Sequence, residues 1–256
     1  MRILALGDVV GAAAIEYLAD RLWQFRNREK IDFTVANGEN ATEIRGLCAA
    51  DAKALLGTGI DLLTLGNHAF GIRDLYDYLD SGAPIIRPAN FPPTAPGSGY
   101  TVIRVGGLRL LCINVQGRVY LDPLASPFET VERILEREKG SYDLSLMDIH
   151  AEATSEKLAI ANYFDGRINL MFGTHTHVPT ADTRLLPKGS AYVTDLGMCG
   201  PVDSILGTDK DAVIQKFTTL MPTRFSVAKG SITAQGVVYE INDATLKPTS
   251  VKRIEF

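Results

Sequence analysis

The fold is decided by residues 2–40, RILALGDVVGAAAIEYLADRLWQFRNREKIDFTVANGEN, in which two short apolar runs flank a helical stretch. The runs are Ile3–Leu6 and Phe33–Ala36, and the helical stretch passes through Ile15–Phe25. Strands that are apolar on both faces and separated by helices are typical of a parallel sheet with helices on it. We therefore predict a strand–helix–strand unit with Asp8 and Glu39-Asn40 at the carboxyl ends of its strands.

The same alternation continues along the chain. Further strands are predicted at 62–65, 85–86, 143–147 and 168–172, with helices around 49–56, 72–79, 128–138 and 154–164. Gly106-Gly107 joins two strand-like runs and predicts a hairpin. The remainder is β-rich, including Phe225–Ala228, with one helix near 212–220. We predict an α/β fold in which residues 1–256 form a single domain, a four-layer α/β/β/α sandwich of two mixed sheets.

Composition narrows the class of protein. A net charge of −4 argues against a protein that coats duplex nucleic acid, which usually carries a basic excess. Three cysteines, at 48, 112 and 199, form no metal-binding spacing and are typical of a reducing compartment. We find no secretion signal and no apolar run long enough to span a bilayer, so we expect a cytoplasmic protein without a membrane partner.

All four histidines follow short apolar runs. Their settings are Gly66-Asn67-His68, Asp148-Ile149-His150 and Gly173-Thr174-His175-Thr176-His177. In parallel sheets the carboxyl ends of the strands share one edge, where binding sites form. Imidazoles, carboxylates and carboxamides gathered at such an edge are suitable ligands for a two-metal hydrolytic site.

Each of these residues, taken alone, also has an ordinary structural explanation. Asp8 fits the N-cap of the following helix better than a metal ligand. Asn67-His68 fits a turn, and His150 fits a hydrogen-bonded core histidine. His175 and His177 point to the same side of an extended segment, a spacing that also arises by chance. The coincidence of five strand ends that each carry a ligand-type residue favours metal binding.

The same strings resemble those of the calcineurin-like metallophosphoesterase superfamily, and more closely those of the bacterial YmdB family. The resemblance covers nearly the whole chain and rests on Gly7-Asp8, 37–40, 66–68, 87–90, 148–157, 173–182 and 194–201. It implies the fold of metallo-dependent phosphatases and a dinuclear centre of iron, with manganese or zinc as alternatives. Carried over position by position, it implies Asp8, Asn40 and His177 on one metal, Asn67, His150 and His175 on the other, and Glu39 bridging.

The resemblance also implies a reaction. The family acts on 2′,3′-cyclic nucleotides, so we expect a phosphodiesterase with a small phosphorylated substrate. In it a hydroxide that bridges the metals attacks phosphorus, and His68, which is not a ligand, protonates the leaving oxygen. Two alternatives stay open: a phosphomonoesterase or nucleotidase on the same metals, and a regulatory or RNA-associated binding protein with incidental hydrolysis. Assembly into a homo-oligomer is compatible with either.

Three loops beside the ligands depart from the family pattern. They are Ala12–Ala14, Ala41–Gly46 and Ala69–Gly71. Val10 stands where most of the superfamily has a histidine, and Asn40 is expected to replace that ligand. Arg45 lies in one altered loop, where it either contacts substrate phosphate or, as is more common for arginine, is simply solvated. These departures concern substrate contacts rather than metal ligands.

Overall fold

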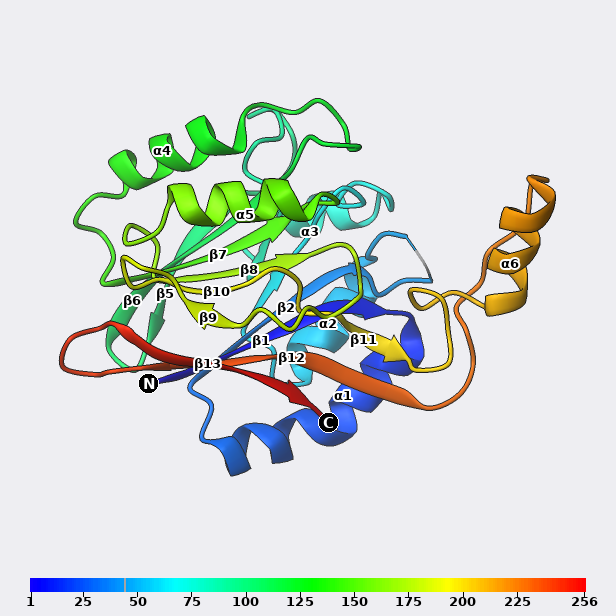
Figure 1. Cartoon of the computed structure of the whole chain (residues 1–256), viewed down its shortest axis with the longest axis horizontal. Coiled ribbons are helices and arrows are strands. Elements are labelled where there is room, and N and C mark those ends of the chain that lie inside the picture. Colours follow the sequence, from blue (N-terminus) through cyan, green and yellow to red (C-terminus); the bar gives the residue numbers. More distant parts are fainter. Residues whose placement is uncertain (44) are drawn as a thin grey trace.

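The computed structural model describes residues 1–43 and 45–256, so Ile44, within the altered loop 41–46, lies outside the described residues. Two sheets pack face to face (Figure 1), and the first has the order β13-β12-β11-β1-β2-β3-β4. Its strands are β1 (Arg2–Val10), β2 (Phe33–Asn40), β3 (Leu62–Thr64), β4 (Ile85–Ile86), β11 (Met198–Pro201), β12 (Ile232–Ile241) and β13 (Pro248–Glu255). Strands β1 to β4 are parallel and β12 is antiparallel to β1, so this sheet is mixed.

The second sheet has the order β5-β6-β7-β8-β10-β9. Its strands are β5 (Tyr100–Val105), β6 (Leu108–Gln116), β7 (Leu144–His150), β8 (Leu170–Thr174), β9 (Arg184–Leu185) and β10 (Ala191–Val193). The predicted hairpin is confirmed, because β5 and β6 are antiparallel and joined by Gly106 and Gly107. Both glycines have positive φ angles, 56° and 88°, as a tight hairpin turn requires.

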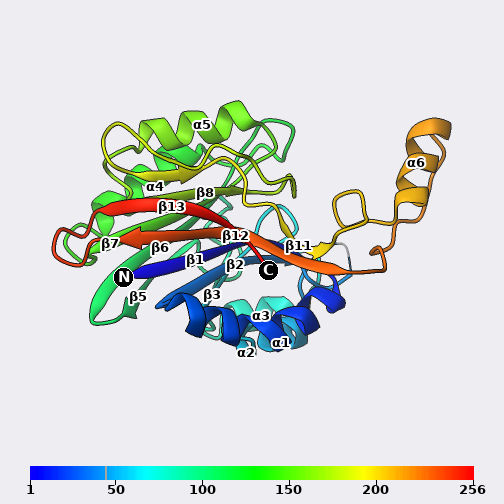
Figure 2. The same ribbon diagram turned by 60° about the horizontal axis from the view of Figure 1, so that its bottom comes forward.

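Helices cover the outer faces of both sheets (Figure 2). The helices on the first sheet are α1 (Ala12–Glu29), α2 (Ala49–Gly57) and α3 (Leu75–Leu79), and those on the second are α4 (Pro127–Arg137) and α5 (Thr154–Tyr163). One apolar core lies between the sheets and one lies under each helical layer. The predicted four-layer sandwich is therefore confirmed.

Helix α1 shows why the first layer forms. Its buried residues recur at helical spacing, with Leu18, Leu22 and Phe25 packed on the first sheet. The helix ends where Lys30 takes a left-handed conformation, with φ of 53°. Helix α6 (Lys210–Thr219) is different, because it extends away from the two sheets in both views (Figures 1 and 2).

Several details differ from the sequence prediction. Asp8 and Glu39-Asn40 lie within β1 and β2 rather than after them, because the two strands stay paired through register shifts on either side of Asp8. Phe225–Ala228 was expected to be a strand, but Val227 makes only an isolated bridge with Thr208. Among the described residues, no helix is both long enough and apolar enough to cross a membrane.

Candidate metal centre

The two sheets bring the predicted site residues together at the carboxyl ends of their central strands. Asp8 lies on β1, Glu39 and Asn40 lie on β2, and His150 is the last residue of β7. The remaining residues stand on the segments after β3 and β8, namely Asn67, His68, His175 and His177. Residues more than 160 positions apart thus become neighbours, since the backbone N–H of His175 donates to Asp8 Oδ2 at 3.1 Å.

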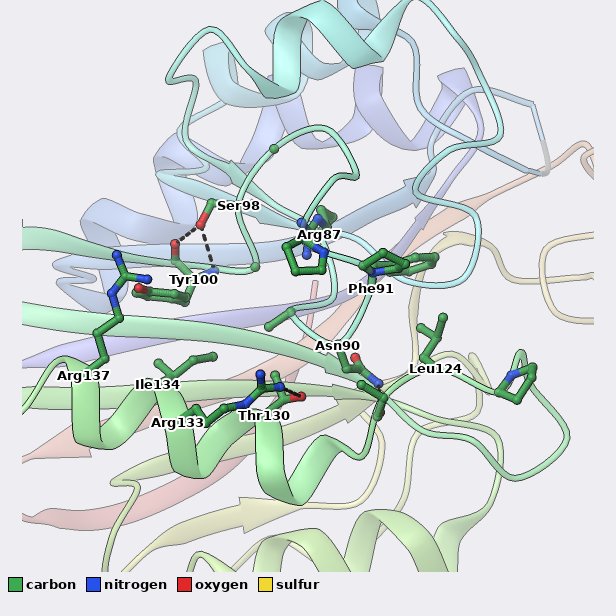
Figure 3. Close-up of a pocket in the computed structure, with 17 residues that line it drawn as sticks. Arg87, Asn90, Phe91, Ser98, Tyr100, Leu124, Thr130, Arg133, Ile134 and Arg137 are labelled. Atoms are coloured by element: carbon green, nitrogen blue, oxygen red, sulfur yellow. Dashed lines mark hydrogen bonds between the residues drawn. The ribbon is translucent and has the colours of Figure 1, made fainter.

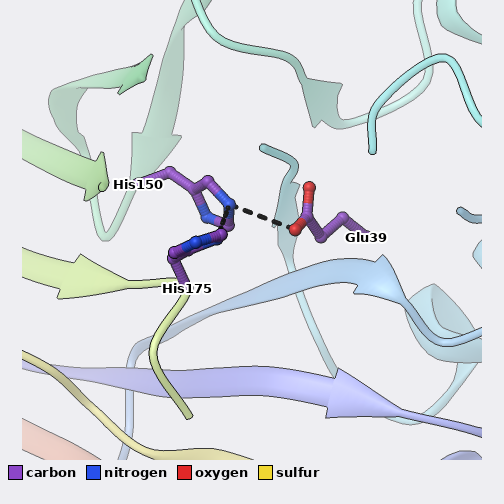
Figure 4. A group of neighbouring side chains, drawn as sticks. All are labelled: Glu39, His150 and His175. Carbon is purple, nitrogen blue, oxygen red and sulfur yellow. Dashed lines mark hydrogen bonds and ion pairs between the residues drawn. The ribbon is translucent and has the colours of Figure 1, made fainter. Parts of the chain in front are cut away.

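Three side chains converge most closely (Figure 4). The Nε2 atom of His150 lies 3.1 Å from Glu39 Oε1 and 3.1 Å from Nδ1 of His175. Candidate ligand atoms of these three residues all lie within 4.8 Å of one another. Asn67 joins them, with its Oδ1 2.9 Å from the same Nε2 atom. Four ligand-type atoms therefore meet in one place, and both Glu39 and His150 are buried there.

A second group also contacts Glu39. The Nε2 atom of His177 is 3.5 Å from Asp8 Oδ1 and 3.3 Å from the carboxamide nitrogen of Asn40. That nitrogen is in turn 3.5 Å from Glu39 Oε1. The predicted ligands therefore lie in two groups that both contact Glu39, and their role in binding metal stays a prediction.

The imidazoles are oriented by acceptors on their outer sides. His150 Nδ1 lies 2.9 Å from the hydroxyl of Thr174, which donates to Asp148 Oδ1 at 2.7 Å. Because that hydroxyl gives its proton to Asp148, it accepts the proton on Nδ1 and leaves Nε2 facing the centre. His175 turns Nε2 toward Glu152 at 3.1 Å, so its Nδ1 faces inward.

His177 is oriented in the same way, by a backbone group. Its Nδ1 lies 3.0 Å from the carbonyl oxygen of Leu206, which fixes Nε2 toward Asp8. Asp8 has no role as a helix cap. The residue that caps α1 is Gly11, and Asp8 is fully buried in β1. The N-cap interpretation of Asp8 is therefore wrong.

The buried carboxylates remain charged. Burial raises the pKa of Asp8, but the combined effects of His177, His150 and the backbone N–H of His175 outweigh burial, and the pKa is about 2. Burial likewise opposes ionisation of Glu39, but the charge and hydrogen bond of His150 together with the charge of His68 outweigh burial, so this pKa is also lowered. The histidines respond in turn: despite burial, Glu39 raises the pKa of His150 and Asp8 raises the pKa of His177 to about 9. Two buried negative charges thus attract cations, which are protons when no metal is bound.

His175 differs from its neighbours. Burial and then the nearby His150 cation lower its pKa to about 4. Its nitrogen therefore offers a free electron pair at neutral pH, which is the state that binds a metal. His175 and His177 also have positive φ angles, 94° and 59°. A left-handed backbone costs about 1–2 kcal/mol at such residues, so the surrounding structure must hold this segment in place.

His68 lies beside the two sets without joining the close group. Its backbone N–H donates to Glu39 Oε2 at 2.9 Å, and its ring lies 3.2 Å from the Asn67 side-chain nitrogen. Burial lowers the pKa of His68, Glu39 opposes this, and Arg45 adds to it. Arg45 is exposed and acts on His68 through its charge, whereas its contact with substrate stays a prediction.

Gly66 gives the first test of this packing. A Cβ atom at position 66 would lie 2.1 Å from His150 Nε2, which is closer than two non-bonded heavy atoms can approach. We expect Gly66→Ala to lower metal affinity by roughly 100-fold and stability by about 1–3 kcal/mol. Gly57→Ala is the matched control, because a Cβ there has no described atom within 4 Å. Metal analysis and thermal unfolding measure both effects, and unchanged metal binding in Gly66→Ala would contradict the placement of His150.

A cavity of about 780 Å³ lies elsewhere, between the loop after β4 and helix α4 (Figure 3). None of its lining residues belongs to the two ligand sets. The guanidinium of Arg87 points toward it but donates to three backbone carbonyls, those of Pro88, Ala95 and Pro96. The cavity lining contains Asn90 and Tyr100 but no histidine, cysteine or carboxylate, so it holds no group of metal ligands like the one around Glu39.

Histidine ligands need acceptors on their outer sides, and the sequence offers Asp148 and backbone carbonyls as candidates, whereas the other residues that support the predicted ligands are not evident from it. Lys157 and Asp195 form an ion pair of 2.7 Å beneath the histidine segment, and Thr174 orients His150. A signal was present, because Lys157 and Asp195 lie in two of the blocks that carry the resemblance. Nothing in a single sequence, however, pairs one block with the other.

Known proteins are similar to this chain along nearly its whole length. The sequence pattern of the family described as YmdB-like protein matches residues 4–254. A Bacillus subtilis protein named 2′,3′-cyclic-nucleotide 2′-phosphodiesterase is 44% identical over 254 residues, which cover 99% of this chain and 96% of that protein. Two crystal structures superpose with TM-scores of 0.94, and both cover 100% of this chain. A hypothetical protein from Thermus thermophilus has 40% identity with 99% of its chain covered, and a novel phosphatase from Mycoplasma pneumoniae has 32% with 93% covered.

Proposed function

The chain belongs to the YmdB-like family, and from this we propose that it is a metal-dependent phosphodiesterase that hydrolyses 2′,3′-cyclic nucleotides. The relative from Bacillus subtilis carries that activity in its name. One observation in the structure supports the proposal above the others. Two sets of ligand-type side chains face each other, and the buried carboxylate of Glu39 contacts members of both.

The residues fit a pair of metal ions. Asp8 Oδ1 is buried and has no hydrogen-bond partner among residues 1–43 and 45–256, which a cation would supply. His150 and His175 turn nitrogens toward each other at 3.1 Å, an arrangement that a shared positive charge stabilises. The proposed ligands are Asp8, Asn40 and His177 for one ion, Asn67, His150 and His175 for the other, and Glu39 for both.

The donor set also restricts the kind of metal. Nitrogen and oxygen ligands without a thiolate suit iron, manganese or zinc, and we propose iron first. When bound, a metal pair would lower the pKa of a water molecule and would place positive charge beside the phosphoryl oxygens of the substrate. The protein's own contribution is the fixed orientation of the three imidazoles by Thr174, Glu152 and the Leu206 carbonyl.

His68 is proposed to protonate the leaving ribose oxygen, which is a poor leaving group as an anion. Its backbone N–H donates to Glu39 Oε2, and its ring lies beside the Asn67 carboxamide. The lowered pKa makes its imidazolium a stronger acid, while a smaller fraction of molecules carries that proton near neutral pH. We therefore propose His68 as the one histidine that acts on substrate instead of metal.

A substrate panel tests the function. The metal-loaded protein is assayed with 2′,3′-cyclic mononucleotides, nucleoside monophosphates and an aryl diester under identical conditions. We expect kcat/KM to be largest for the cyclic nucleotides. Faster turnover of the monophosphates would instead identify a phosphomonoesterase, and the absence of turnover on all three classes would identify a binding protein.

A further inference from the structure

A fully buried ion pair lies beneath the histidine segment. Lys157 is on α5 and Asp195 follows β10, and neither side chain is exposed to solvent. The Lys157 ammonium donates to Asp195 Oδ2 at 2.7 Å. Lysine is rarely buried completely, and a buried ion pair usually adds little net stability. Stability alone therefore does not explain why this ion pair is buried.

The second partner of Asp195 is the residue between the two histidines of this segment. The hydroxyl and the backbone N–H of Thr176 both donate to Asp195 Oδ2, at 2.7 and 3.3 Å. The other carboxylate oxygen accepts from the backbone of Gly197 at 2.8 Å. The Asp195 carboxylate thus connects Thr176 to the backbone of Gly197, and the Lys157 ammonium neutralises the charge of that carboxylate.

Lys157 also touches the start of the segment. A Cβ atom at Gly173 would lie 2.7 Å from Lys157 Cδ, so the lysine stem passes directly beside the end of β8. From there the chain enters the two left-handed residues, His175 and His177. A backbone that is unfavourable at both histidines relaxes unless something anchors the residue between them.

We propose that Lys157 and Asp195 are positioning residues, which hold Thr176 so that His175 and His177 face the two metal ions. The inference rests on the proposed function, because it assigns these residues a role toward that metal pair. Neither residue is proposed to touch metal or substrate. Because Lys157 and Asp195 act through the hydrogen bonds between Asp195 and Thr176, a substitution at Thr176 tests their role directly.

Two variants and one control test the proposal. Thr176→Val keeps the side-chain shape and the ion pair but removes the hydroxyl donor, and Lys157→Met removes the cation. Arg26→Met is the control, because the Arg26 side chain, 10% exposed, forms an ion pair of 3.0 Å with the more exposed Asp61 and donates to the carbonyl of Gly59. Each protein is stripped of metal and titrated with Co²⁺, recording the visible absorption spectrum and the resistance of bound Co²⁺ to a chelator.

We expect Thr176→Val and Lys157→Met to bind Co²⁺ roughly 10- to 100-fold more weakly, with an altered spectrum, as is common when the support of metal ligands is removed. Arg26→Met should keep the wild-type spectrum and affinity even if its Tm falls. Wild-type affinity and spectrum in folded Thr176→Val would overturn the proposal, whatever happens to Tm. If Lys157→Met fails to fold, Thr176→Val decides the question alone.

The same titration separates this inference from the proposed function. Suppose that the wild-type protein binds Co²⁺ but hydrolyses no cyclic nucleotide, and that the variants lose Co²⁺. This result would support the positioning role and contradict the proposed activity. A wild-type protein that binds no Co²⁺ would overturn both. Hydrolysis by the wild type together with unaffected variants would overturn the positioning role alone.

Discussion

Glu39→Ala should lose both metal ions together and lower kcat/KM for phosphodiesters by about 10³-fold or more. Glu39 is 1% exposed and contacts both ligand sets, through His150 at 3.1 Å and Asn40 at 3.5 Å. Its removal takes away half of the negative charge that Asp8 and Glu39 place at the centre. Elemental analysis of the purified variant measures metal per chain directly.

Glu39→Gln is the matched comparison for this result. It keeps the side-chain length and an oxygen for the backbone N–H of His68, but it removes the charge. We expect it to lose metal almost as fully as Glu39→Ala, since charge rather than shape holds the ions. A full metal pair retained in Glu39→Ala would refute the bridging role, and loss of one ion alone would place Glu39 in a single set.

His68→Ala should show the opposite pattern, with metal retained and turnover lost. We expect kcat for a cyclic nucleotide to fall by about 10²- to 10⁴-fold, the usual contribution of a general acid. An aryl diester should lose only a few-fold, because its leaving group needs no proton. Because His68 is not among the proposed ligands, the metal content should stay at the wild-type value.

The contrast between the two substrates is what tests the assignment of His68. Equal losses on the cyclic nucleotide and the aryl diester would exclude a proton donor and indicate a role in binding phosphate. Loss of metal in His68→Ala would instead make it a ligand. Arg45→Ala, which removes the neighbouring exposed cation, is a useful comparison, since unchanged kcat/KM there leaves Arg45 without a substrate contact.

Much of the fold could be predicted because its strands are apolar on both faces. Strands such as β1 and β7 are buried between a helical layer and a second sheet, and this leaves a continuous apolar run in the sequence. Strand β11, Met198–Pro201, was missed because four residues that include glycine and proline carry no such run. It forms by pairing with β1 and β12, which are distant in sequence.

The residues that meet at the centre could also be predicted, whereas most of the residues that support them could not. Polar residues next to apolar strands stand out in a sequence, and every predicted ligand lies at the centre. Lys157 does not stand out, because a lysine on a helix is normally solvated and its burial depends on Asp195, 38 residues later. The extension of β1 through Asp8 depends likewise on register shifts against β2, which the sequence pattern does not reveal.

The most direct test of a two-metal phosphodiesterase is a metal titration followed by activity. Metal is removed from the wild-type protein with a chelator, Fe²⁺ or Mn²⁺ is added back stepwise, and the initial rate of 2′,3′-cyclic nucleotide hydrolysis is recorded. The account predicts negligible activity without metal and a rate that levels off at two ions per chain, as two sets of ligands around Glu39 require. Full activity in the metal-free protein, or a plateau at one ion per chain, would contradict it.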